Sequence, residues 1–154
     1  MTQSKIRCRV ALGLVSVALL VSGVTAFPLP QEVGLLAGWL DPSTPLGAWI
    51  HRVEDALVYN QENFPFMAYG TDWLAFAHIM LAVLFLGAMR DPARNLWVIE
   101  FGLLACAGVL ALALICGPLR GIPFFWQLVD CSFGAFGAIP LWFARREALS
   151  ASAG

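Results

Sequence analysis

Residues 96–116 read LWVIEFGLLACAGVLALALIC, an apolar run in which Glu100 is the only charged residue. A membrane-spanning helix needs about 20 consecutive, predominantly apolar residues, with a range of about 17–25. Three further runs reach this length, at residues 10–26, 73–89 and 123–144. The sequence therefore predicts an all-α, polytopic membrane protein with four transmembrane helices.

The composition of the whole chain indicates the same class. Of its 154 residues, 60% are hydrophobic and 12% are charged, against about 45–50% and about 25% in soluble domains. A fold of this size buries only about two-thirds of its surface, so soluble, disordered and fibrous classes are excluded. The net charge of −1 provides no concentrated basic face, which excludes a nucleic-acid partner. We expect a single membrane domain over residues 1–154, surrounded by the lipid bilayer.

The links between the last three spans are short, at residues 90–95 and 117–122, which predicts an up-down bundle. An amino terminus in the cytoplasm places seven of the nine basic side chains inside, namely Lys5, Arg7, Arg9, Arg90, Arg94, Arg145 and Arg146. Lysine and arginine are enriched on the cytoplasmic side of membrane proteins. Because no organelle signal is present, we expect a multi-pass protein of the bacterial inner membrane with both termini in the cytoplasm.

Capping residues mark the expected helix boundaries. Thr71 and Asp72 are good caps before the second span, and Asp91-Pro92 predicts the start of the third helix. Glu100 lies near the beginning of that helix, so we expect it to pair with the two arginines of the preceding link.

The stretch between the first two spans, residues 27–72, is expected to be an extracytoplasmic loop that contains amphipathic helices. Apolar residues recur at helical spacing after a Thr44-Pro45 start signal, namely Leu46, Trp49, Ile50, Val53 and Leu57. Residues 31–40 form a shorter apolar run. Two interpretations stay open, since such helices can lie on the outer leaflet and cover the bundle or pack as a small external cap without a ligand.

The amino-terminal span has a second interpretation. Residues 1–26 resemble a secretory signal, with a basic start, an apolar centre and small residues at Val24-Thr25-Ala26. Cleavage after Ala26 would leave three spans. The apolar run is longer than the core of about 7–15 residues in a signal peptide, so we expect an uncleaved anchor helix.

Ionisable residues inside a membrane are costly and mark candidate functional sites. His78 follows Asp72 by six residues and Asp130 follows Pro123 by seven, so each lies about 10 Å below the outer interface. If their helices are neighbours, the two side chains face one another, and Arg120 in the outer link competes as a partner for Asp130 or Asp72. This candidate polar site either holds a proton, a metal ion or a polar ligand, or links the helices by a bond of about 0.6–2 kcal/mol.

Small residues on the same part of the chain predict close helix packing. Gly134 and Gly137 share a face with Asp130, and Cys106 lies in a run of glycines and alanines in the third span. Close approach of helices at small residues is typical of membrane proteins.

Two of the thiols Cys106, Cys116 and Cys131 could form a redox pair, or all three could be small packing residues. We favour packing. No CxxC spacing is present, so no zinc site is expected. The second histidine, His51, lies outside the predicted spans, which excludes a haem held by two histidines between spans. A single-histidine haem at His78 stays open, but we expect no cofactor.

The sequence contains no P-loop, GxGxxG, GxSxG or HExxH motif. We therefore expect a non-catalytic accessory protein, sensor or assembly partner that binds another membrane protein or a second copy of itself. The alternative is a membrane-embedded site for a proton, a metal or a lipophilic ligand, built on His78 and Asp130.

Overall fold

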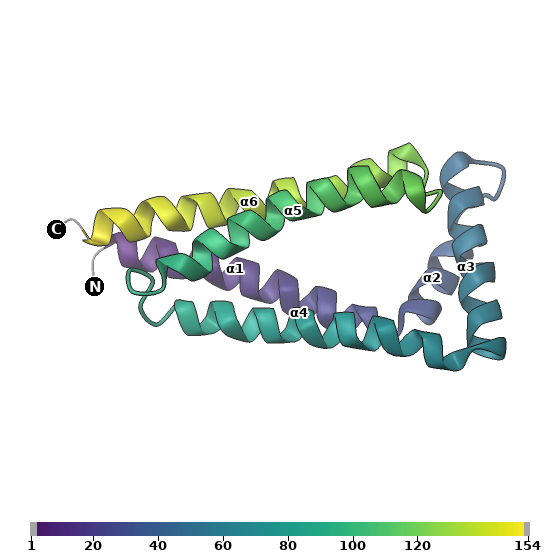
Figure 1. Cartoon of the computed structure of the whole chain (residues 1–154), viewed down its shortest axis with the longest axis horizontal. Helices are drawn as coiled ribbons and strands as arrows, with labels where there is room; N and C mark the ends of the chain where they lie inside the picture. The colour runs from purple at the N-terminus through teal and green to yellow at the C-terminus, as the bar shows by residue number, and fades with distance from the viewer. Residues whose placement is uncertain (1–2, 153–154) are drawn as a thin grey trace. The chain divides into compact units, whose positions relative to one another are not determined.

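A computed structural model describes residues 3–152 of the chain. Over these residues the protein is entirely helical, which confirms the predicted class (Figure 1). The elements in chain order are α1 (Gln3–Ala26), α2 (Leu29–Ala37), α3 (Pro45–Asn63), the short 3-10 helix η1 (Pro65–Met67), α4 (Ala68–Ala88), α5 (Leu96–Leu119) and α6 (Phe124–Ser152).

Four helical segments are long and apolar enough to cross a membrane, as the sequence predicts. They are Gln3–Ala26, Pro65–Ala88, Leu96–Leu119 and Phe124–Ser150. Each extends beyond the apolar run from which it was predicted, because helix geometry continues into polar and interfacial residues at the ends of the runs. Helices α2 and α3 confirm the predicted helical content between the first two spans.

Two predicted helix starts are wrong. Helix α4 begins at Ala68 directly after the 3-10 turn that Pro65 opens, so Thr71 and Asp72 lie inside the helix rather than before it. Asp91 does not start α5; its Oδ1 accepts the backbone N–H of Arg94 at 3.3 Å and stabilises a turn that precedes the helix. Asx turns of this kind compete with helix capping.

The predicted start of α3 is confirmed. The Thr44 hydroxyl accepts the backbone N–H of Gly47 at 3.0 Å, and Pro45 occupies the first helical turn. A Cβ atom on Gly47 would lie only 1.9 Å from the backbone oxygen of Asp41. The turn before α3 therefore needs glycine at this position.

The chain forms two compact units. The terminal unit contains residues 3–18 and 81–152, and the middle unit contains residues 19–80. Helices α1 and α4 each contribute to both units, whereas α5 and α6 belong wholly to the terminal unit.

In the terminal unit, α5 and α6 lie side by side as a hairpin (Figure 1). A Cβ atom on Gly134 would lie 2.6 Å from the backbone oxygen of Cys106, and one on Gly137 would lie 3.2 Å from its Sγ. The small-residue face that the sequence predicts is therefore the contact between α5 and α6. The largest fully buried side chains of the unit are Leu12, Ile99, Val98 and Cys8.

Polar bonds also join the helices of the terminal unit. The Ser16 hydroxyl on α1 donates to the backbone oxygen of Ala82 on α4 at 2.6 Å. Glu100 pairs with Arg145 on α6, with Nη2 to Oε1 at 2.9 Å. The expectation that Glu100 pairs with the arginines before α5 is wrong, because α6 brings Arg145 to the carboxylate.

In the middle unit, α2 packs against α3 and the end of α1 packs against α4. The α1–α4 contact is close, since a Cβ atom on Gly23 would lie 2.8 Å from the backbone oxygen of Ala75. The His51 ring on α3 bridges two oxygens, with Nδ1 3.4 Å from Glu54 Oε2 and Nε2 3.3 Å from the backbone oxygen of Leu40. The contact with Leu40 ties α3 to the link that precedes it.

Candidate functional site

Asp130 and Arg120 both lie in the terminal unit, but no hydrogen bond or ion pair joins them in the structure. Asp130 is half-buried on α6, and within the described part of its own unit no side chain bonds its carboxylate. Arg120 is exposed directly after the end of α5, where its backbone N–H bonds the Cys116 oxygen at 3.0 Å. Asp130 is therefore a carboxyl group inside an apolar helix with unused bonding capacity.

His78 and Asp72 lie on α4 in the middle unit. His78 is half-buried, and its Nδ1 donates to the backbone oxygen of Leu74 at 2.8 Å. A carbonyl oxygen can only accept, so Nδ1 carries a proton. In the neutral form of such a ring, Nε2 is an acceptor. Because His78 and Asp130 belong to different units, their pairing stays a prediction.

Aromatic side chains form a shallow hollow around the first turns of α4. Its volume is about 290 Å³, and its lining is Phe27, Tyr69, Asp72, Trp73 and Phe76. The rings of Tyr69 and Trp73, and those of Trp73 and Phe76, meet edge to face with centroids 6.0 Å apart. Edge-to-face contact is a favourable arrangement for a pair of aromatic rings.

All the cysteines of the chain are free thiols in the structure. Cys106 is half-buried against Gly137 of α6, which is the position of a packing residue. Cys131 is half-buried and Cys116 is exposed. The buried Cys8, which the sequence analysis did not single out, donates to the backbone oxygen of Ala144 at 3.3 Å and joins α1 to α6.

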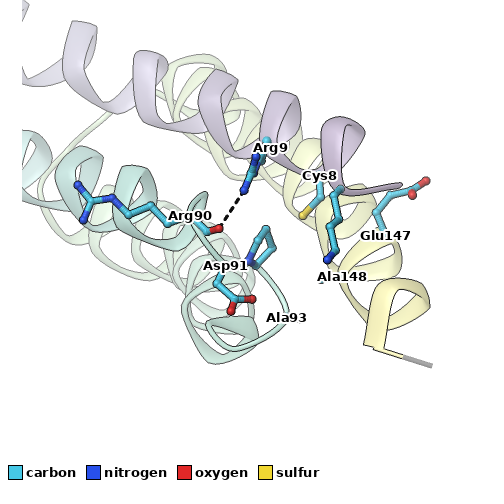
Figure 2. A pocket seen from close by; sticks show the side chains of 9 residues that line it. Cys8, Arg9, Arg90, Asp91, Ala93, Glu147 and Ala148 are labelled. Atoms are coloured by element: carbon cyan, nitrogen blue, oxygen red, sulfur yellow. Dashed lines mark hydrogen bonds between the residues drawn. The ribbon is translucent and has the colours of Figure 1, made fainter. Parts of the chain in front are cut away.

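A polar cavity lies where the start of α1, the turn after α4 and the end of α6 meet in the terminal unit (Figure 2). Its volume is about 190 Å³. It is lined by Lys5, Cys8, Arg9, Arg90, Asp91, Pro92, Ala93, Glu147 and Ala148. We call it the basic cavity, because three cationic side chains stand among its lining residues against two carboxylates.

Arg9 is fixed in the wall of the basic cavity by the end of α4. Its Nε donates to the Met89 oxygen at 2.9 Å and its Nη2 donates to the Arg90 oxygen at 3.0 Å, as the dashed line in Figure 2 shows for Arg90. The last carbonyl groups of a helix lack partners within the helix. A cation at this end is also stabilised by the negative end of the helix dipole. Arg9 therefore holds a positive charge at a defined place.

Both carboxylates of the cavity have local partners. Asp91 accepts the Arg94 N–H in its own turn, and its Oδ2 lies 4.0 Å from Arg94 Nε. Glu147 receives the Ser4 hydroxyl from α1. Sequence reasoning counted the basic residues of this region only as a topology signal, because their meeting at one cavity depends on how α1, α4 and α6 pack.

Over residues 3–152, no three histidine, cysteine, aspartate or glutamate side chains gather as ligands for a metal ion. Comparison of the chain with protein-family models, with curated proteins and with solved structures finds no match.

Proposed function

We propose that the chain is a non-catalytic accessory or assembly partner of another membrane protein. It lies in a bacterial inner membrane as an up-down bundle of four spans, with both termini in the cytoplasm and α2 and α3 outside. The docking surface for a span of the partner is the exposed edge of α6 beside the α5 contact, where Asp130 is half-buried.

Asp130 is the observation that carries this proposal. A carboxylate at the centre of a membrane helix costs about 2.5–3.5 kcal/mol on insertion, and one about 10 Å below the interface, as Asp130 is predicted to be, bears part of that cost. Asp130 has no partner within the described part of its own unit. A hydroxyl, amide or basic side chain on a neighbouring span would offset this cost. Helices α5 and α6 also bury only 22% and 17% of their most apolar 18-residue windows within the chain, which leaves wide faces for other spans and for lipid.

The docking surface is tested by photo-crosslinking in intact membranes. A photoreactive amino acid replaces Phe133, which is exposed on α6 one turn from Asp130, in chains with Asp130, with Asp130→Leu, or with the exposed Phe136→Leu as the control. We expect one protein adduct of defined mass that Asp130→Leu abolishes and Phe136→Leu preserves. Adducts with lipid alone, or a protein adduct that persists in Asp130→Leu, would contradict the proposal.

The orientation is tested separately by reporter fusions. Alkaline phosphatase, which is active only outside the cytoplasm, is fused after Pro42 in the link before α3 or after the last residue. We expect activity from the first fusion and none from the second. Activity from the carboxyl-terminal fusion would contradict the proposed orientation.

The second candidate function is a membrane-embedded site for a proton or a lipophilic ligand between His78 and Asp130. Within its own unit, each group keeps an atom that can form a further hydrogen bond. These atoms are Nε2 of His78, since Nδ1 bonds Leu74, and the carboxyl oxygens of Asp130. A protonated Asp130 carboxyl could donate to Nε2, and so could a ligand placed between them.

Cysteine crosslinking decides between the two functions. In a chain whose natural cysteines are replaced by serine, His78→Cys and Asp130→Cys are combined and oxidised, and His78→Cys with Phe136→Cys serves as the control pair. Selective crosslinking of the first pair would support the embedded site. No crosslinking in either pair would favour the accessory function.

A further inference from the structure

We infer that the basic cavity binds a phosphate group, of the kind that an anionic phospholipid headgroup or free phosphate carries. Neither Asp130 nor His78 lines the cavity, so the inference goes beyond the proposed function. It depends on the charges, the size and the position of the cavity.

The charges favour an anion. Lys5, Arg9 and Arg90 line the cavity, and hydrogen bonds to the backbone oxygens of Met89 and Arg90 hold Arg9 there. Asp91 and Glu147 also line it. Asp91 is paired with Arg94, with Oδ2 4.0 Å from Nε, whereas the Ser4 hydroxyl that bonds Glu147 leaves the negative charge of that carboxylate in place. Figure 2 shows that the Arg90 side chain runs away from Arg9, which leaves the ammonium of Lys5 and the guanidinium of Arg9 as the cations at the cavity, against the carboxylate of Glu147. Charge-assisted bonds from such groups to phosphate oxygens are among the strongest in proteins.

The size of the cavity selects a small group. Pockets for drug-sized ligands measure about 300–1,000 Å³, and this cavity measures about 190 Å³. It therefore accommodates a headgroup or an inorganic anion rather than a whole metabolite. The acyl chains of a lipid would remain outside the cavity, against the apolar surface of the bundle.

The position of the cavity agrees with a lipid phosphate. The cavity opens at the ends of four candidate spans, between the first turns of α1, the turn after α4 and the last turns of α6. Ends of transmembrane helices lie at the depth of the lipid headgroups. Basic pockets between such ends bind anionic headgroups in other membrane proteins.

The test measures binding of three compounds to the full-length protein in maltoside micelles by calorimetric titration. The compounds are dihexanoyl phosphatidylglycerol, inorganic phosphate and dihexanoylglycerol, which has the same acyl chains but no phosphate. We expect the phosphatidylglycerol to bind and the dihexanoylglycerol not to bind above the micelle background. Binding of inorganic phosphate with similar affinity assigns the site to free phosphate, and binding of the lipid alone assigns it to a headgroup. Both results support a phosphate site.

Two matched variants show whether the phosphate compounds bind at the cavity. Lys5→Gln and Arg7→Gln each remove one positive charge from an exposed side chain at the start of α1, but only Lys5 lines the cavity. We expect Lys5→Gln to weaken binding about 5-fold and Arg7→Gln less than 2-fold, since one basic group near a membrane surface contributes an effect of about that size. Equal weakening by both variants would indicate diffuse surface charge and overturn the inference.

A variant that adds a positive charge to the cavity provides a second test. Ala93 lines the cavity from the turn after α4 and is half-buried, so Ala93→Lys adds a cation without removing a structural contact of Arg9. We expect binding to tighten about 5-fold. Unchanged binding in Ala93→Lys, or no binding of either phosphate compound to the unsubstituted protein, would overturn the inference.

Discussion

Replacement of Gly134 by alanine tests the close contact between α5 and α6. The added Cβ atom would lie 2.6 Å from the backbone oxygen of Cys106, whereas carbon–oxygen contacts between helices are about 3.3–3.6 Å. The two backbones must therefore separate by about 0.7–1.0 Å. Overpacking of this kind costs about 1–3 kcal/mol, so we expect the variant to be less stable by that amount.

Gly108→Ala is the matched control for this prediction. Gly108 also lies in the apolar part of the hairpin, but a Cβ atom there meets nothing within 4 Å. Alanine is favoured over glycine inside a helix by about 0.5–1 kcal/mol, so we expect this variant to be neutral or slightly stabilised. Unfolding of both variants is followed by circular dichroism against the mole fraction of dodecyl sulfate in mixed micelles. Equal stability of the two variants would refute the close-contact reasoning.

Three further predictions concern single polar interactions. Ser16→Ala removes the hydroxyl that bonds α4, and we expect a loss of about 0.6–1.7 kcal/mol in the same assay, against a smaller change for Ser132→Ala, whose hydroxyl bonds its own helix. Arg145→Gln removes the partner of Glu100 and should lower stability by up to about 1 kcal/mol, a difference that added salt reduces; an effect that salt leaves unchanged would argue against the ion pair. For Asp41, the hydrogen bond from the backbone N–H of Ser43 holds the pKa of the carboxyl below its usual value. The stabilisation of the folded protein by this bond is therefore complete above the ordinary carboxyl pKa and is lost as the pH falls through the lowered pKa. Nuclear magnetic resonance titration of Asp41 with an ordinary carboxyl pKa would contradict this.

The apolar runs predicted the helices well, because length and hydrophobicity decide whether a segment forms a membrane helix. The predicted starts at Asp72 and Asp91 were wrong because a capping residue is recognised by local sequence, while its use depends on the turn that precedes the helix. The 3-10 turn at Pro65 brings the start of α4 forward to Ala68, and Asp91 uses its carboxylate inside a turn.

The polar contacts were harder to predict than the helices. Glu100 has arginines close to it in sequence, yet its partner is Arg145, which is 45 residues away. The basic cavity likewise joins Lys5, Arg90 and Glu147 from three separate helix ends. Such meetings depend on how the helices pack, so the sequence could identify the charged residues without indicating which of them share a site. The small-residue contact of Gly134 and Gly137 could be predicted, because the spacing along one helix already places both on one face.

The bond between Cys8 and Ala144 has a consequence for the synthesis of the chain. Its two residues are 136 positions apart, and a ribosome adds about 5–20 residues per second, so α1 waits roughly 7–27 s for this part of α6 to be made. The α5–α6 hairpin closes within a short stretch and can form as soon as it leaves the ribosome. Ser16 can bond Ala82 as soon as α4 is made, whereas Cys8 must be sheltered by lipid or by the insertion machinery until the end of α6 follows.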